Sequence, residues 1–279
     1  MTGDQGVWVY AIAKYVGGDV FLPAGVAKTP VRAIAAGGLT ALASDVDLAE
    51  FGEEALRRNL ENLTWLEEMA RAHHNVVDAA VRLFPVLPTR FSTVYRSEAT
   101  MVAALAERAD QLRSALARVG GRMEWGVKAY AVPAGEGDPT AGKGDPTAGN
   151  GDASEPITAN VAGQGPGTDA ESGAGMAYLK RRRAQISARQ EFSRTAAASA
   201  REVHIELSGH AAQVRLYPPQ APALSRTKAP MLLNASYLID AGGSERFGSV
   251  VAVATAAHPD LQLDLTGPWP PYSFTGLEG

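Results

Sequence analysis

One short segment near the C-terminus strongly limits the conformations open to this chain. Residues Leu265–Phe274 read L-T-G-P-W-P-P-Y-S-F, with three prolines and one glycine. Proline lacks a backbone donor and clashes with the preceding helical turn, so we expect neither a helix nor a central strand here. An extended arm of polyproline type remains, and it presents the rings of Trp269, Tyr272 and Phe274. Such an arm either clamps its own domain or docks on a partner.

Composition excludes several classes of protein. The chain has 279 residues, long enough for two domains, and 46% hydrophobic and 20% charged residues, as in ordinary globular proteins. It has no cysteine, which excludes disulfides and zinc–thiolate sites and is typical of a reducing cytosol. The net charge of −4 gives no general attraction to nucleic acid. No long apolar run or signal peptide is visible, so we expect a cytoplasmic protein without a membrane partner.

A tandem repeat interrupts the second half of the chain. The sequence G-D-P-T-A-G-K at 137–143 is followed by G-D-P-T-A-G-N at 144–150. The surrounding segment, 134–175, is rich in glycine and acidic residues and carries a net charge of −6. It offers too little apolar surface to offset the entropy lost on ordering. We therefore predict that 134–175 is a disordered acidic insertion.

The order of predicted elements indicates an α+β protein with two domains. The first domain, 1–120, has a strand at 7–13, a hairpin around Gly37-Gly38 and two long helical stretches, at about 56–83 and 97–119. The second domain, 121–279, gives the order β-α-β-β-α-β, which is that of a modified ferredoxin-like unit. Its elements are expected at 123–132, 176–212, 213–217, 231–239, 244–257 and 261–265. The acidic segment then lies within the second domain, after its first strand.

The residues contain no recognisable catalytic or metal-binding motif. There is no G-x-S-x-G, H-E-x-x-H or Walker A pattern, so we predict no enzymatic activity, no catalytic or metal site and no cofactor. His73 falls on the apolar stripe of its helix, where a packed, hydrogen-bonded histidine is favoured over a metal ligand. The basic run Lys180–Arg183 is interpreted as a solvated helix surface, with an acidic docking partner as the functional alternative.

Seven fragments in order along the chain resemble the gas vesicle protein L/F family (GvpL/GvpF). They are V-W-V-Y-A-I at 7–12, W-L-E-E-M-A-R-A-H-H-N-V-V at 65–77, V-L-P-T-R-F-S-T-V-Y at 86–95, E-W-G-V-K at 124–128, A-Y-L-K-R-R at 177–182, L-N-A-S-Y-L-I-D at 233–240 and the arm at 265–274. The resemblance implies a gas vesicle accessory or minor structural protein. It would bind the apolar major shell protein, and other accessory proteins are further candidate partners. It would help nucleate or assemble the shell in the cytoplasm, without enzymatic activity.

The family resemblance suggests a role for the aromatic residues near the expected domain junction. Our hypothesis is that Trp125, Trp269, Tyr272 and Phe274 contact the shell subunit, and the alternative is that they seal the two domains together. A function of another class also stays open, a ferredoxin-like regulatory module that binds a small metabolite.

Overall fold

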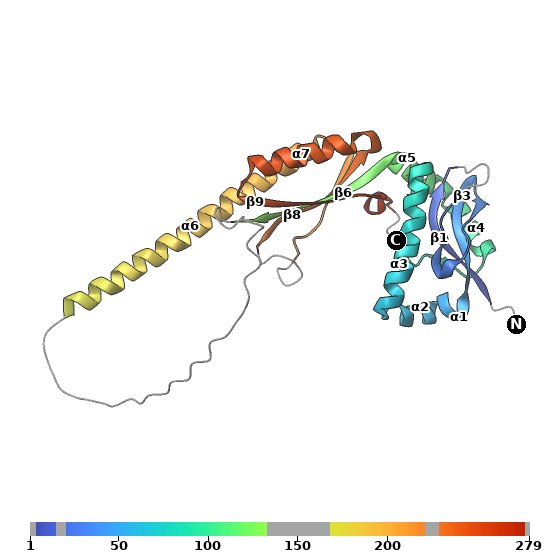
Figure 1. Ribbon diagram of the computed structural model, residues 1–279, viewed down its shortest axis with the longest axis horizontal. Helices are drawn as coiled ribbons and strands as arrows, with labels where there is room; N and C mark the ends of the chain where they lie inside the picture. Colours follow the sequence, from blue (N-terminus) through green and yellow to red (C-terminus); the bar gives the residue numbers. More distant parts are fainter. Residues whose placement is uncertain (1–3, 15–20, 133–167, 221–228, 277–279) are drawn as a thin grey trace, which may run out of the picture.

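The computed structural model describes residues 4–14, 21–132, 168–220 and 229–276. It is a mixed α/β structure with two antiparallel sheets, one built from each half of the chain. The two sheets follow one another along the long axis, and one helix extends well past the second sheet (Figure 1). Among the described residues, no helix is long and apolar enough to span a membrane.

The first sheet is organised around its central strand β1. Its strands are β1 (Gln5–Ala13), β2 (Arg32–Ala36), β3 (Leu39–Asp47), β4 (Val86–Pro88) and β5 (Val94–Tyr95). Their order is β2-β3-β1-β4, with β5 also paired to β1. The predicted hairpin is confirmed: Gly37 and Gly38 have φ of 59° and 74° between β2 and β3. Such positive φ values at both central positions define the primed turn that matches strand twist.

Helices cover both faces of the first sheet. They are α1 (Leu48–Phe51), α2 (Glu53–Asn59), α3 (Leu63–Leu83), α4 (Glu98–Glu107) and α5 (Ala109–Val119). Trp8 and Tyr10 share an apolar cluster with residues of α3, whereas Val7 and Val9 share one with residues of α4 and α5. Because side chains alternate along a strand, β1 is buried on both faces.

Each of the two long helical stretches predicted for this half is interrupted. The first, at 56–83, divides between α2 and α3 at Asn62, whose side-chain oxygen accepts hydrogen bonds from the backbone N–H groups of Thr64 and Trp65. The second divides at Arg108, which has φ of −101° between α4 and α5. The apolar periodicity of the sequence continues across these breaks because the shorter helices on either side bury their apolar faces in neighbouring parts of one core.

The second sheet has the predicted order of elements along the chain. They are β6 (Arg122–Ala131), α6 (Thr168–Ser208), β7 (Gln213–Leu216), β8 (Met231–Asp240), α7 (Ser244–Ala257) and β9 (Leu261–Trp269). The strands lie in the order β7-β8-β6-β9, and every neighbouring pair is antiparallel. Val203 and Leu207 of α6 and Phe247 of α7 pack with inward side chains of β6 and β8.

Two boundaries in this half differ from the prediction. Helix α6 begins at Thr168, so the end of the segment predicted to be disordered (134–175) lies in a helix; the rest of that segment, to 167, lies outside the described residues. Strand β9 runs on to Trp269, through a proline and past the expected end at 265. Because β9 is an edge strand with a register shift opposite Glu124, a residue without an N–H is tolerated there.

Candidate functional site

The C-terminal segment, residues 267–276, connects the second sheet to the first. Its 3₁₀ turn, Tyr272–Phe274, replaces the polyproline conformation expected for the arm. Tyr272 packs against the cluster that contains Trp8 and Met69, while Phe274 belongs to the cluster on the other face of the first sheet. Leu238 of β8 joins the same cluster as Phe274. The segment therefore inserts two rings into the core of the first half of the chain.

A buried carboxylate holds this segment in place. Glu124 of β6 is 8% exposed. Its Oε2 accepts a hydrogen bond from the backbone N–H of Ser273 at 2.9 Å, and its Oε1 accepts bonds from Ser273 Oγ at 2.6 Å and Ser236 Oγ at 2.7 Å. Hydrogen bonds to an ionised acceptor are stronger than neutral ones. Glu124 thereby fixes the turn against both central strands of the second sheet.

Two arginines hold the carbonyl groups of the same turn. Arg215 Nη1 of β7 donates to the backbone oxygen of Ser273 at 2.8 Å. Arg118 of α5 donates from Nη2 to the backbone oxygen of Thr275 at 3.2 Å and, at 3.4 Å, to that of Phe274. The C-terminal segment is thus bonded to side chains from both halves of the chain.

The beginning of the segment requires glycine at one position. Gly267 has φ of 118°, a conformation that L side chains rarely adopt. A Cβ atom there would lie 2.8 Å from the backbone oxygen of Glu124 and 3.3 Å from Trp125 Cε3. The edge strand can therefore approach β6 closely only with glycine at this position.

The four aromatic residues of our hypothesis have different surroundings. Phe274 is 5% exposed and Tyr272 is half-buried. Trp125 packs in the core of the second sheet, with its ring centroid 6.0 Å from that of Phe247. Trp269 is 47% exposed, and its ring centroid lies 5.6 Å from that of His74. The structure brings Trp269, Tyr272 and Phe274 to the junction of the two sheets, and it places Trp125 in a separate core.

Sequence reasoning did not assign a structural role to Glu124, Ser273, Arg118 or Arg215. These residues come from β6, the C-terminal turn, α5 and β7, so no local motif unites them. The one available signal was the presence of Glu124 in a strand otherwise rich in apolar and small residues. A carboxylate at such a position needs buried donors.

His73 is a packed histidine, as predicted. It is 2% exposed, and its Nδ1 accepts a hydrogen bond from Trp8 Nε1 at 3.0 Å. The rings of Tyr10, Phe91 and Tyr272 surround it, with centroids 5.4, 5.8 and 6.4 Å away. Burial lowers the pKa of His73 to about 4, with a small contribution from His74. The neutral imidazole is therefore part of the wall that receives Tyr272.

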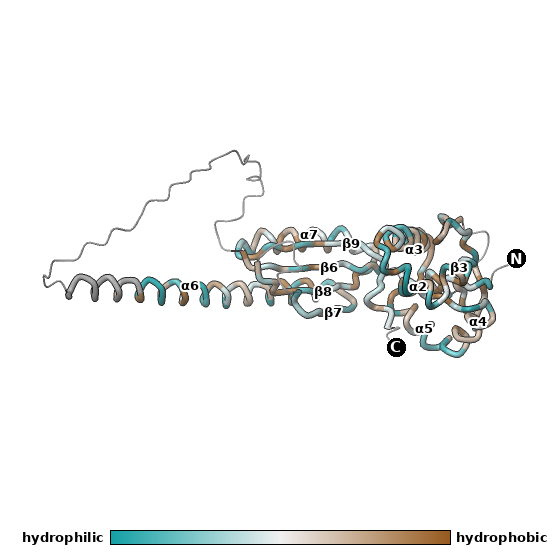
Figure 2. The backbone as a smooth tube through the Cα atoms, turned by 90° about the horizontal axis from the view of Figure 1, so that it is seen from below, coloured by the Kyte–Doolittle hydropathy of each residue, from teal (hydrophilic) through white to brown (hydrophobic). Residues whose placement is uncertain are grey.

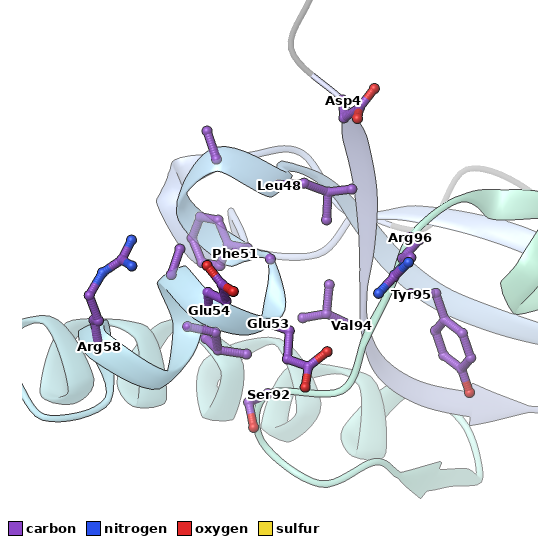
Figure 3. A pocket seen from close by; sticks show the side chains of 14 residues that line it. Asp4, Leu48, Phe51, Glu53, Glu54, Arg58, Ser92, Val94, Tyr95 and Arg96 are labelled. Carbon is purple, nitrogen blue, oxygen red and sulfur yellow. The ribbon is translucent and has the colours of Figure 1, made fainter.

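An open cavity lies at the far end of the first sheet. Its volume is about 770 Å³, and it is formed by α1, α2, β5 and the start of β1. Figure 3 shows Leu48, Phe51 and Val94 around it, with charged groups at its edge. The lining includes the side chains of Asp4, Ala49, Glu53, Glu54, Leu56, Arg58, Ser92, Tyr95 and Arg96. A lining that mixes apolar side chains with charges of both signs is suited to a segment that carries both apolar and charged groups. No group of three or more metal-ligating side chains occurs among the residues that the structure describes.

Removal of the Glu124 carboxylate should release the C-terminal turn. Glu124→Ala leaves Ser236 and Ser273 without their acceptor, so we expect a loss of about 2–3 kcal/mol of stability. Hydrogen exchange measured by mass spectrometry should become faster in 270–276. The matched control is Asp110→Ala, which removes a fully exposed carboxylate. Unchanged exchange in 270–276 would contradict the role given to Glu124.

Acidification should destabilise the first half of the chain through His73. The folded-state pKa of about 4 lies below the ordinary value of 6.5, so the unfolded chain binds the proton more readily. Stability should therefore fall as pH decreases from 6.5 towards 4, by about 3 kcal/mol in total from this group. Denaturant unfolding at several pH values should show a smaller loss in His73→Gln. His210→Gln, at an exposed site, should behave like the wild type.

Comparisons with known proteins agree along nearly the whole chain. Residues 6–276 match the family described as gas vesicle synthesis protein GvpL/GvpF. The chain is 34% identical to gas vesicle protein L of Streptomyces sp. (strain CB03234), over 99% of this chain and 95% of that protein. It is also 38% identical to gas vesicle protein F2 of Halobacterium salinarum, over 17% of this chain and 22% of that protein.

Solved structures show the same fold. The crystal structure of GvpF from Anabaena sp. PCC7120 has a TM-score of 0.62 at 20% identity, covering 99% of this chain and 98% of that one. GvpF from Microcystis aeruginosa has a TM-score of 0.61 at 18% identity, covering 98% of this chain and 99% of that one. Together with the sequence match over residues 6–276, these findings show that this chain belongs to the GvpL/GvpF family of gas vesicle synthesis proteins.

Proposed function

We propose that this chain is an accessory or minor structural protein of gas vesicles that binds the apolar major shell subunit and assists nucleation or assembly of the shell. Membership of the GvpL/GvpF family supports the gas vesicle role. An apolar subunit must be kept from aggregating in water before it joins a shell. The proposed function is binding and delivery at the vesicle, and it includes no enzymatic step, cofactor or nucleic acid.

The observation that carries the binding step is the open cavity of the first sheet. Leu48, Leu56 and Val94 are only half-buried, so their apolar surfaces are accessible in the cavity. Its volume of about 770 Å³ can receive several side chains of a partner. We assign it to an apolar segment of the shell subunit, with the rim charges binding polar groups beside that segment.

The arrangement of the second half supports a two-domain protein. We propose domains at 1–120 and 121–279, the second a modified ferredoxin-like unit with the acidic repeat inserted after its first strand. The support is the strand order β7-β8-β6-β9, with neighbours antiparallel and α6 and α7 contributing to one core. The second domain then places the C-terminal turn against the first.

The C-terminal segment serves mainly to lock these domains together. Tyr272 and Phe274 are packed against clusters of the first domain, and Trp125 fills the core of the second. A partner could reach Tyr272 or Phe274 only by displacing that packing. Trp269 differs because 47% of its surface is exposed. Its ring is therefore available for contact with the shell subunit.

A bulky charged residue at the edge of the cavity should block binding. Ala49 is exposed and lines the cavity, so Ala49→Arg should fill its entrance without disturbing the core. We expect capture of the purified shell subunit to fall by about fivefold or more, equivalent to roughly 1 kcal/mol. Ala103→Arg is the matched control, because Ala103 is exposed on α4 outside the cavity. Equal capture by the two variants would remove the cavity from the binding step.

Normal vesicles, seen by electron microscopy after deletion of the gene, would overturn the assembly role itself.

The exposed ring of the C-terminal segment can be tested separately. Trp269→Ala removes a side chain that contacts His74 and is 47% exposed, so the fold should tolerate the change with little loss of stability. We expect weaker capture of the shell subunit, by about threefold. Phe274→Ala is the comparison: it should lower stability by about 3 kcal/mol because it leaves a cavity in the core. Undiminished capture by folded Trp269→Ala protein would limit the whole segment to domain locking.

A further inference from the structure

The part of helix α6 from residue 179 to residue 191 belongs to none of the apolar clusters that the described residues form. The helix extends beyond the second sheet, and its outer half is separate from the rest of the protein in two views (Figures 1 and 2). Residues 179–191 are all exposed. Met176, Leu179 and Ile186 are 70%, 56% and 49% exposed. We call residues 176–194 the free arm of α6.

The exposed apolar side chains of the free arm lie on one side of the helix, whereas Phe192, near its inner end, packs against the core of the second sheet. Each residue turns the helix by about 100°, so Met176, Leu179 and Ile186 fall within an arc of about 80°, which also contains Arg183. The face that packs on the sheet, with Val203 and Leu207, is rotated by roughly 120° from this stripe. The exposed stripe is therefore a second face of the helix and does not continue the one that packs on the sheet.

The free arm is strongly basic. It carries six cations (Lys180, Arg181, Arg182, Arg183, Arg189 and Arg194) and one carboxylate, that of Glu191, for a net charge of +5. The rest of the protein is acidic overall, because the complete chain has a net charge of −4. In the described ranges, the ion pairs all lie outside the free arm. Its positive charge is therefore available to a partner.

A helix with these properties is unstable by itself. Isolated helices gain little from propensity alone, and most helical stability in proteins comes from packing of an apolar face. Like charges three apart, such as Lys180 and Arg183, repel one another and lower the stability further. A partner that covers the stripe and neutralises the cations would remove both costs.

We propose that the free arm of α6 binds an acidic amphipathic helix of a partner protein. The partner's apolar side chains would cover Met176, Leu179 and Ile186, and its carboxylates would pair with the arginines beside the stripe. Such a contact uses the helix-in-groove or helix-pair mode of recognition, in which anchors recur every three or four residues. This surface is distinct from the cavity of the first sheet, so the proposal goes beyond shell-subunit binding.

Charge and polarity distinguish this partner from the alternatives. A second copy of the chain would place one arm of charge +5 beside another, which is repulsive. A nucleic acid or an anionic lipid surface would satisfy the cations, but a nucleic acid would leave the stripe of Met176, Leu179 and Ile186 exposed. A lipid surface would favour cations confined to one polar face, whereas Arg181, Arg182 and Arg183 point in successive directions about 100° apart. An acidic helix with an apolar stripe matches both features.

The test uses the full chain and a designed peptide as the probe. The fluorescent peptide is a helix with leucine at the a and d heptad positions and glutamate beside them, and binding is measured by anisotropy at 0.15 M salt. Arg182→Glu, Arg183→Glu and Arg189→Glu together should weaken binding by about tenfold or more. Leu179→Gln with Ile186→Gln should weaken it by about fivefold while keeping good helix formers.

Matched controls separate a specific contact from general charge or stickiness. Arg57→Glu, Arg71→Glu and Arg82→Glu reverse three exposed arginines on α2 and α3, and Val253→Gln removes an apolar side chain that is 64% exposed on α7. These variants should bind the peptide within about twofold of the wild type.

Four results would overturn the proposal. The first is that the acidic peptide does not bind, and the second is that a scrambled peptide of the same composition binds equally well. The third is that sedimentation shows concentration-dependent dimers that the Leu179→Gln, Ile186→Gln variant abolishes. The fourth is that duplex DNA or anionic phospholipid vesicles bind more tightly than the peptide and that the arginine triple variant abolishes this binding. None of them depends on the shell subunit, so failure here leaves the proposed function standing, and the reverse also holds.

Discussion

The hydrogen bonds between Glu124 and the C-terminal turn determine how the two halves of this protein are joined. One carboxylate, 8% exposed, accepts bonds from Ser273 and Ser236 and so ties the last segment of the chain to the central strands of the second sheet. With the turn fixed there, Tyr272 and Phe274 enter clusters on opposite faces of the first sheet. A buried carboxylate without these donors would be costly, so the turn and the buried position of Glu124 stabilise each other.

Because this junction buries most of the aromatic residues of the C-terminal segment, a partner must bind at other surfaces of the protein. The aromatic residues that our hypothesis assigned to partner binding mostly pack within the protein. Trp269 is the exception, with 47% of its surface exposed. The accessible features are the cavity of about 770 Å³ at the end of the first sheet and the basic free arm of α6. They lie in different halves of an elongated molecule, so two partners could bind at the same time. Such a bivalent arrangement suits a protein that takes part in an assembly.

Local patterns predicted the elements well where the physical cause was itself local. The Gly37-Gly38 pair indicated the β2–β3 hairpin because both positions need positive φ, and the helical stripe of α3 placed His73 in the core. The breaks at Asn62 and Arg108 were missed because apolar periodicity continues through them. The end of β9 was also missed, because tolerance of a proline depends on its being an edge strand at an irregular register.

By itself, the sequence determined the types and order of most elements, the burial of His73 and the family to which the chain belongs. These follow from side-chain periodicity, turn residues and motifs that occupy short stretches of chain. Only the tertiary structure decided which aromatic rings are buried, that Glu124 holds a turn 149 positions away, and that half of α6 extends beyond its sheet. The physical reason is that burial and hydrogen bonding depend on which segments meet in space. Glu124, Arg118 and Arg215 contact the C-terminal turn from distant parts of the sequence, and no local sequence pattern relates them to it.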